Sequence, residues 1–215
     1  MEEKRPIYFK RLIASFIIAT LFFVGGFLIS QMVSYSKYQS VSISQEKLRY
    51  TLLNLDLEKQ LMMESCDLFD PYTLSDELES MGAVITILEQ RFGKLDSRVL
   101  EQKKMYTMLE VQHMLFVRDY NDRCGEPNYS IILFFYSNNE DYATAAERVG
   151  YVLGSFKNQN ENVMIYSFDY DLVGSSLINL LKTKYEIIEQ NTIIVGDEDK
   201  IVNLKNLREL EGYFE

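Results

Sequence analysis

A long uncharged apolar run stands near the start of the chain. Residues 12–36 contain no charged side chain, and about 20 apolar residues at ~1.5 Å per residue span the hydrocarbon core of a bilayer. A cleaved signal peptide, the alternative, would carry a shorter apolar core of about 7–15 residues and a small-residue cleavage site. The pattern therefore predicts a transmembrane helix over residues 12–36, in contact with the lipid bilayer.

The apolar positions that follow this run have a helical period. Leu48, Leu52, Leu55 and Met62 recur at spacings of four, three and seven residues, as one face of an α-helix requires. Pro71 disfavours a helical conformation at the residue before it, so the first helix should end ahead of it. The spacing predicts a helix that leads from the membrane toward the rest of the chain.

Two further helices are expected before the pattern changes. The second should run from Thr73 or Ser75, residues that favour N-caps, to Gly93, a residue typical of helix C-termini. A third helix follows and ends before Cys124. Short connections make consecutive helices antiparallel neighbours. Residues 37–127 are therefore predicted to form a helical, coiled-coil-like stalk or hairpin domain.

From Tyr129 onward, short continuous apolar runs bounded by polar residues replace the helical stripes. Such runs are typical of buried strands. The expected order is strand, helix, strand, helix, strand, strand, helix. The ranges are 129–137, 141–157, 162–168, 172–185, 192–196, 200–204 and 205–214. The first two strands should be parallel with a right-handed crossover, and the last two should form an antiparallel hairpin.

Charge sets the expected topology and excludes one class of partner. Residues 1–11 contain four basic side chains, whereas only Lys37 follows the apolar run closely. The positive-inside rule then predicts a single-pass protein of the cell membrane, with the tail 1–11 cytoplasmic and the C-terminal domain outside. The chain carries a net charge of −10; without the tail, 18 basic and 30 acidic residues leave −12. Such a surface repels phosphate backbones, so no nucleic acid is expected as a partner.

The cysteines suggest a disulfide rather than a metal site. Cys66, Cys124 and the single histidine, His113, are far apart in the sequence, whereas a zinc site usually needs four close-set ligands. No metal or other cofactor is expected. An up-down-up arrangement of the three helices brings the two cysteines to one end, in a compartment that permits disulfides. A Cys66–Cys124 bridge is predicted, with two unpaired thiols as the alternative.

The C-terminal elements resemble the thioredoxin superfamily. The segment "IILFFYSNNEDYATAAERVGYVL" resembles the strand and active-site helix of that family. The segment "YSFDYDLVGSSLINLLKTKYEI" is similar to the second strand and the helix that ends in Tyr-x-Ile. The segment "NTIIVGDEDKIVNL" looks like the part that begins with cis-Pro-Thr in thioredoxins. The resemblance covers residues 129–215 and implies a thioredoxin-like α/β domain, β-α-β-α-β-β-α, over residues 128–215 of a membrane-anchored α+β protein.

The same resemblance implies that the redox chemistry of the family is absent. Spacing places the Cys-x-x-Cys positions near Ala143 and Ala146, and the cis-proline position on Asn191. That chemistry needs a thiolate at the helix N-terminus and a second thiol three residues on. The chain is therefore not expected to be an enzyme. A non-proline cis peptide costs ~3 kcal/mol, so Asn191 is expected to be trans.

Binding is the function that this resemblance leaves. The domain is expected to act as a scaffold or adaptor in an envelope complex, or as a holder of extended polypeptide. Thioredoxin-like folds present a groove beside the former cis-proline loop, where an extended peptide can add backbone hydrogen bonds. The residues expected to contribute are Tyr136, Tyr142, Gln190, Asn191, Thr192 and Ile193.

Two alternatives to this function are open. In the first, Cys66 and Cys124 form a reversible pair, and the protein is a thiol-disulfide oxidoreductase or chaperone. In the second, the chain is a structural oligomerisation module that forms a homo-oligomer through its stalk. The first predicts a labile disulfide, and the second predicts that the C-terminal domain can be deleted without loss of the partner. The sequence does not specify the partner.

Other polar residues have simpler explanations. The cluster 137–141 suits a helix cap, and the acidic run 197–199 suits a solvated hairpin turn. Asp169 and Asp171 end a strand, where α/β folds tend to bind ligands, but no base or nucleophile stands near them in the sequence. His113 has apolar neighbours and is expected to be a packing residue.

Overall fold

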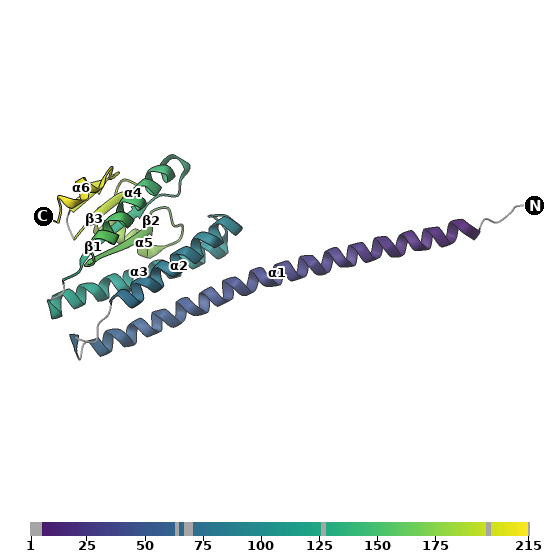
Figure 1. Cartoon of the computed structure of the whole chain (residues 1–215), viewed down its shortest axis with the longest axis horizontal. Coiled ribbons are helices and arrows are strands. Elements are labelled where there is room, and N and C mark those ends of the chain that lie inside the picture. Colours follow the sequence, from purple (N-terminus) through teal and green to yellow (C-terminus); the bar gives the residue numbers. More distant parts are fainter. Residues whose placement is uncertain (1–5, 63–64, 67–70, 126–127, 197–198, 215) are drawn as a thin grey trace, which may run out of the picture. The chain divides into compact units, whose positions relative to one another are not determined.

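The protein is a mixed α+β chain with one four-stranded sheet. The computed structural model (Figure 1) describes residues 6–62, 65–66, 71–125, 128–196 and 199–214. Its internal contacts divide the chain into two units, Met1–Gln45 and Glu46–Glu215. The acidic turn expected at 197–199 lies partly outside the described residues, because only Asp199 belongs to them.

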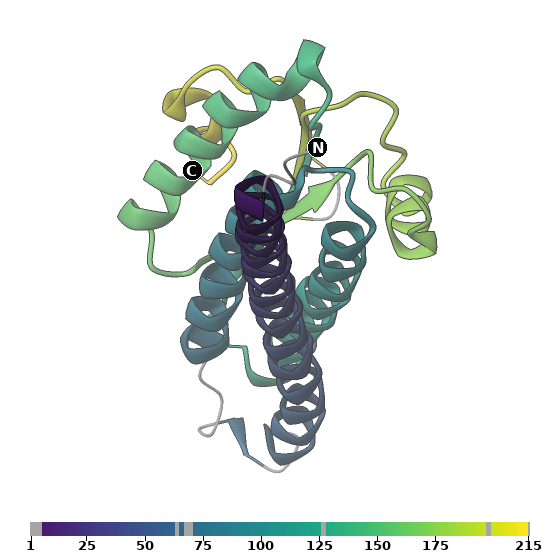
Figure 2. The same cartoon turned by 90° about the vertical axis from the view of Figure 1, so that its right-hand side faces the viewer.

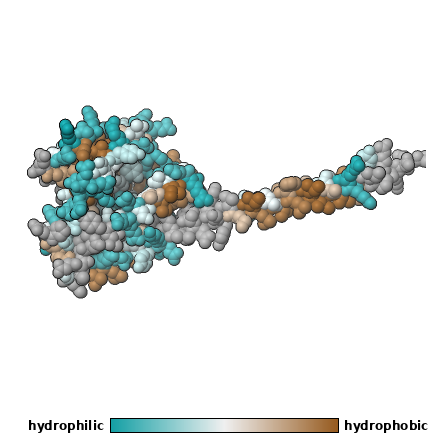
Figure 3. Space-filling model, in the orientation of Figure 1, coloured by the Kyte–Doolittle hydropathy of each residue, from teal (hydrophilic) through white to brown (hydrophobic). Residues whose placement is uncertain are grey.

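Helix α1, Pro6–Met62, forms the described part of the first unit, and its residues 46–62 belong to the second unit. Within it, Tyr8–Met32 is a 25-residue apolar segment whose mean hydropathy reaches 2.6 and whose side chains are exposed. Figure 3 shows this segment as a hydrophobic surface. The predicted apolar helix is therefore present, and it is long and apolar enough to cross a membrane.

Helices α2, Pro71–Phe92, and α3, Ser97–Cys124, form an antiparallel hairpin. Helix α2 begins earlier than Thr73 or Ser75, because the fixed φ of Pro71 suits the first helical position. It ends before Gly93, which has the predicted left-handed conformation with φ 92°. Helix α3 is longer than predicted, since Cys124 is its last residue rather than a residue beyond it.

The end of α1 packs on this hairpin. Leu55 is buried in the same core as residues of α2 and α3. Lys59 forms an ion pair with Asp119 of α3 at 2.5 Å, and Lys47 forms one with Glu77 of α2 at 3.7 Å. Residues 46–62 of α1 therefore belong to the second unit, where they pack beside α2 and α3.

The sheet has the strand order β2-β1-β3-β4. The strands are β1, Ser130–Tyr136; β2, Val163–Asp169; β3, Thr192–Val195; and β4, Asp199–Val202. Strand β1 is parallel to β2 and antiparallel to β3, and β3 is antiparallel to β4. The predicted parallel first pair and antiparallel last pair are both confirmed.

Helices cover both faces of the sheet (Figures 1 and 2). Alternate residues of β1 point to opposite faces: Leu133 and Phe135 join one core with α3 and α5, Ser176–Lys184. Ile132 and Phe134 join the other core with α4, Glu140–Gln159, and α6, Leu207–Glu211. Helix α3 therefore packs directly on the sheet.

Helices α5 and α6, on opposite faces of the sheet, are both shorter than the sequence predicted. Helix α5 begins at Ser176 rather than near residue 172, because Gly174 has φ 73° and Ser175 caps the helix. The Ser175 hydroxyl accepts a hydrogen bond from the Ile178 N–H at 3.3 Å. Helix α6 covers only Leu207–Glu211, with Asn206 as its cap.

Candidate functional site

A cleft of about 390 Å³ opens where β1 ends and α4 begins. Phe134 and Tyr136 of β1 and Ala143 and Ala146 of α4 supply its apolar lining, and α2 supplies the facing wall. The polar residues that line it are Thr86, Glu89, Gln90, Lys94, Ser137, Asn138 and Glu147. The volume is within the range of sites that bind small molecules or single side chains.

The local sequence explains why the chain turns at this point. The apolar run of β1 gives way to Ser137, Asn138 and Asn139, and Asn139 adopts an extended conformation as the N-cap of α4. Its side chain accepts a hydrogen bond from the Asp141 N–H at 3.3 Å. Glu140 and Asp141 complement the helix dipole. The polar cluster at 137–141 thus caps the helix, as its sequence suggested.

Asn191 fastens the β1–α4 loop to the start of β3. Its side chain is fully buried, and its φ of 56° lies in the left-handed region. Its Oδ1 accepts a hydrogen bond from the Ser137 N–H at 3.1 Å, and its Nδ2 donates one to the Tyr142 carbonyl at 3.0 Å. The residue predicted at the cis-proline position therefore contacts both the residue that follows β1 and the first turn of α4, next to Ala143.

The structure separates the residues predicted to bind a peptide. Of the six, Tyr136 lines the cleft, and Asn191 lies behind the loop. Thr192 and Ile193 are buried in β3, whose backbone pairs with β1 on one side and β4 on the other. Tyr142 is 37 % exposed, and Gln190 is partly buried. The backbone of Thr192 and Ile193 is therefore paired on both sides within the sheet, and the groove expected at residues 190–193 stays a prediction.

A buried ion cluster lies beneath the cleft and joins three elements. Lys103 of α3 is 4 % exposed, and its Nζ lies 2.5 Å from Glu89 of α2 and 2.6 Å from Asp169 of β2. Asn138 donates a hydrogen bond to the same Asp169 carboxylate at 2.9 Å, and Lys94 donates one to the Asn138 Oδ1 at 3.0 Å. The loop that forms the cleft is therefore tied to the helical hairpin.

The two carboxylates keep Lys103 charged. Burial alone would lower the pKa of Lys103, but the negative charges and hydrogen bonds of Asp169 and Glu89 outweigh it, so that its pKa is raised. Lys103 is therefore charged at neutral pH although it is buried. The sequence did not identify Lys103 and Glu89 as members of a buried cluster. A lysine on a helix is ordinarily solvated, and nothing in the sequence distinguishes Lys103 from its neighbour Lys104.

A second polar group lies between α3 and β2. Glu110 accepts a hydrogen bond from the Ser167 N–H at 2.9 Å, and the Tyr166 hydroxyl lies 3.0 Å from His113 Nδ1. The second carboxyl oxygen of Glu110 and the Nε2 atom of His113 are buried without a hydrogen-bond partner. These residues line a cavity of about 150 Å³. His113 is buried, as its neighbours predicted, but it packs with polar groups as well as apolar ones.

Burial dominates the acid–base behaviour of this pair. It raises the pKa of Glu110 well above its ordinary value, and the hydrogen bond from Ser167 only partly opposes the change. Burial lowers the pKa of His113 to about 4, and the positive charge of Lys157 adds to the effect. Both side chains therefore favour their neutral forms in the folded protein.

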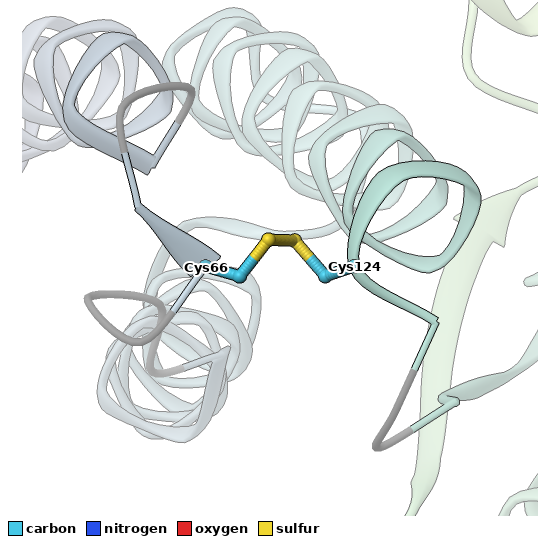
Figure 4. Close-up of a disulfide and its surroundings, with 2 residues drawn as sticks. All are labelled: Cys66 and Cys124. Atoms are coloured by element: carbon cyan, nitrogen blue, oxygen red, sulfur yellow. A yellow bond between two sulfur atoms is a disulfide. The ribbon is translucent and has the colours of Figure 1, made fainter.

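The predicted Cys66–Cys124 disulfide is present (Figure 4). The Cα atoms are 5.8 Å apart, within the 4.4–6.8 Å range that a bridge requires. Cys66 is exposed, Cys124 is partly buried, and neither lines the β1–α4 cleft. The bridge joins the segment after α1 to the last residue of α3, so the up-down-up arrangement that predicted it is also correct.

The residues that line the cleft offer both apolar and polar groups to a ligand. None of the eleven residues that line it is a cysteine or a histidine. Ser137 donates a 2.5 Å hydrogen bond to the Asp171 carboxylate, but a serine nucleophile is ordinarily activated by a stronger base than a carboxylate. What the cleft offers is an apolar floor with amide, ammonium and carboxylate groups around it.

Comparisons with known proteins give no match. No family model, no curated protein and no solved structure is similar to this chain.

Proposed function

We propose that the chain is a single-pass membrane protein whose extracytoplasmic, redox-inactive thioredoxin-like domain binds a protein partner at the β1–α4 cleft. The observation that carries this proposal is the cleft itself, because it lies where the resemblance places the redox pair and has Ala143 and Ala146 in its wall. A site that has lost its thiols but keeps an open apolar lining is suited to recognition.

Membrane anchoring is supported by the exposed apolar segment Tyr8–Met32. Exposed side chains of this kind need an apolar environment, and their helix is long enough for a bilayer. The four basic residues of the tail 1–11 support a cytoplasmic N-terminus. The cysteine bridge agrees with this orientation, since disulfides persist outside the reducing cytoplasm.

The topology of the sheet supports the thioredoxin-like assignment of residues 128–215. The order β2-β1-β3-β4, with only the β1–β2 pair parallel, suits the β-α-β-α-β-β-α arrangement that the resemblance implies. Helices α4 and α6 share one face of the sheet, and α5 lies on the other. Helix α3 adds a layer next to α5.

The partner that suits the cleft is a polypeptide segment with an apolar side chain. Phe134, Ala143 and Ala146 provide an apolar floor for such a side chain. The amide of Gln90, an exposed residue that lines the cleft, can bond to the partner's backbone. Recognition through one inserted side chain and a few peripheral hydrogen bonds is typical of peptide-binding sites.

The test is to fill the cleft in the full-length membrane protein. Leucine at position 143 places a larger side chain in the cleft, so Ala143→Leu should remove the partner that copurifies with the wild-type chain from its native membranes. Thr144→Leu is the matched control, because Thr144 is exposed one residue away and does not line the cleft. Equal recovery of the partner with both variants would exclude the cleft as the binding site.

A second assay addresses the oxidoreductase alternative. The full-length protein in detergent should not accelerate the reduction of insulin disulfides by a thiol reductant, because the cleft contains no thiol. Turnover above the uncatalysed rate that disappears in the Cys66→Ser/Cys124→Ser variant would assign redox chemistry to the exposed bridge. The oligomerisation alternative is tested separately by deleting residues 128–215, which should abolish partner recovery if the cleft is the site.

A further inference from the structure

The segment of α1 in the second unit has two apolar faces. Thr51 and Leu55 are buried against α2 and α3, with Leu52 partly buried beside them. On the opposite face, four apolar side chains are exposed. These are Tyr50, Leu53, Leu57 and Leu61, with exposed fractions of 69, 70, 59 and 55 %. We call these four residues the outer stripe.

The outer stripe is unusual for a helix that already packs on a core. The solvent face of such a helix normally carries charged and polar residues. Here the exposed residues are spaced by three, four and four positions, which keeps them on one face of the helix. Contiguous apolar surface of this kind marks an interaction site.

Helix α3 adds to the same side of the molecule. Asp56 accepts a hydrogen bond from Gln112 at 3.5 Å, and Lys59 pairs with Asp119, so these α3 residues lie beside α1. Met108 and Leu115, four residues before and three after Gln112, share its helix face. Each is 45 % exposed. Two further exposed apolar side chains therefore lie on the face of α3 that meets α1, beside polar contacts between the two helices.

We propose that the outer stripe is the seam of a parallel homodimer. This proposal goes beyond the proposed partner-binding function, and the only part of that function on which it rests is the membrane anchor. Residues 46–62 contain three basic and three acidic side chains, whereas the whole chain carries −10. Two copies of an acidic protein repel each other, so a neutral segment with an apolar stripe is the part along which they can approach.

The spacing fits a coiled-coil seam between two identical helices. Tyr50 and Leu57 are seven residues apart and take the a positions, and Leu53 takes a d position. The next d position is the polar Gln60, and Leu61 stands beside it at the flanking e position. Both copies carry their membrane anchor at the same end of α1, so their stripes run in the same direction. The resulting interface is self-complementary about a two-fold axis along the helices.

The small size of the seam makes the anchor essential to it. Four apolar side chains per copy form a smaller contact than the ~800 Å² per partner of a standard interface. Anchoring two copies in one bilayer raises their effective concentration, which strengthens a weak contact without any new interaction. The dimer therefore belongs to the full-length chain in the membrane.

Cysteine cross-linking in native membranes tests the proposal. The variants Leu53→Cys and Leu57→Cys of the full-length chain should form covalent dimers under mild oxidation, whereas the wild type should not, because its two cysteines are already paired. Tyr151→Cys, on α4, is the control for random collision, since Tyr151 is 81 % exposed and lies outside the seam. We expect about tenfold more dimer from the stripe variants than from the control, a difference of ~1.4 kcal/mol.

Each other outcome overturns the proposal. Equal dimer yields from the stripe variants and Tyr151→Cys would mean that collisions, not a seam, bring the copies together. A cross-link between Leu57→Cys and a different protein would assign the stripe to a hetero-partner. The Ala143→Leu substitution should leave the yield of cross-linked dimer from Leu57→Cys unchanged. The partner-binding proposal is tested by recovery of the partner and the dimer proposal by cross-linking, so either can fail without the other.

Discussion

At the scale of single residues, Glu110 and His113 are the least expected groups in the structure. Each has a buried polar atom without a hydrogen-bond partner, an arrangement that normally costs free energy. The sequence predicted burial of His113 from its apolar neighbours, but it could not predict the cavity. That cavity depends on which residues of β2 face α3. The pairing of β2 with the rest of the sheet decides which residues these are.

Replacement of Glu110 by glutamine should stabilise the protein at neutral pH. The folded-state pKa of Glu110 is raised above 4.5, so its contribution is fully present below about pH 4.5 and is lost as the pH rises through the folded pKa. The glutamine side chain keeps an acceptor for the Ser167 N–H and has no charge to bury. Urea unfolding of residues 46–215 should give Glu110→Gln a higher free energy of unfolding than wild type at pH 8.

That advantage should vanish near pH 4, where both side chains are neutral. Glu101→Gln is the control, because Glu101 is exposed on the same helix and its ion pair with Lys104 is worth little. A wild-type protein that is as stable as Glu110→Gln at pH 8 would mean that Glu110 is solvated rather than buried.

His113 should act in the opposite direction. Its pKa is lowered to about 4 in the folded protein from 6.5, so the unfolded chain binds the extra proton first and stability falls as the pH drops from about 6.5 to about 4. The full loss is roughly 3 kcal/mol. In His113→Gln, the decline in the free energy of unfolding over this window should be smaller than in wild type. An unchanged slope would contradict a buried neutral histidine.

At the scale of elements, α3 holds the second unit together. It packs on α2, on the end of α1 and on the sheet, and it carries Lys103 into the ion cluster beneath the cleft. The sequence predicted the helix but assigned it to a stalk apart from the sheet. Helical periodicity identifies an apolar face of a helix, but it does not show which element packs on that face. Helix α3 is buried on several sides, so its contact with the sheet could not be predicted in this way.

Removal of Lys103 should destabilise the fold strongly. Lys103→Met leaves Asp169 and Glu89 without their counter-charge, and breaking a buried ion pair on one side costs about 3–5 kcal/mol. The neighbouring substitution Lys104→Met removes a partly exposed pair with Glu101 and should cost no more than about 1 kcal/mol. Urea unfolding of residues 46–215 at pH 7 compares the two. Similar losses would show that the cluster is hydrated.

The disulfide should stabilise chiefly through the unfolded chain. Cys66 and Cys124 are separated by 58 residues, and closing a loop of this length contributes about 4 kcal/mol in the chain-entropy model. The Cys66→Ser/Cys124→Ser variant should therefore lose a few kcal/mol of unfolding free energy while its far-ultraviolet circular dichroism stays the same. Loss of helical signal at equilibrium in water would instead make the bridge a condition of folding.

At the scale of the whole molecule, the apolar run, the helical hairpin and the parallel and antiparallel strand pairs were all readable from the sequence. Each depends on local periodicity or on chain connectivity. The β1–α4 cleft was not readable, because its far wall comes from α2, some 50 residues earlier in the chain. The peptide groove predicted at Thr192 and Ile193 remains a prediction, although β4 pairs with that part of β3.

The proposed orientation can be tested in intact cells. Ser155 is exposed on α4, and both native cysteines are in the disulfide. A thiol reagent that cannot cross membranes should label Ser155→Cys in intact cells and should leave the wild type unlabelled. Labelling that appears only after lysis would place residues 128–215 in the cytoplasm and reverse the topology.

The tether made by Asn191 has a consequence for any redesign of the cleft. Cysteines introduced at positions 143 and 146 would enter a loop whose conformation depends on residue 191. A proline at 191 cannot adopt φ 56° and has no side-chain amide for Ser137 and Tyr142. Substitution at 191 would therefore release the β1–α4 loop from the start of β3. One buried asparagine thus couples these two segments, so that neither can be remodelled without the other.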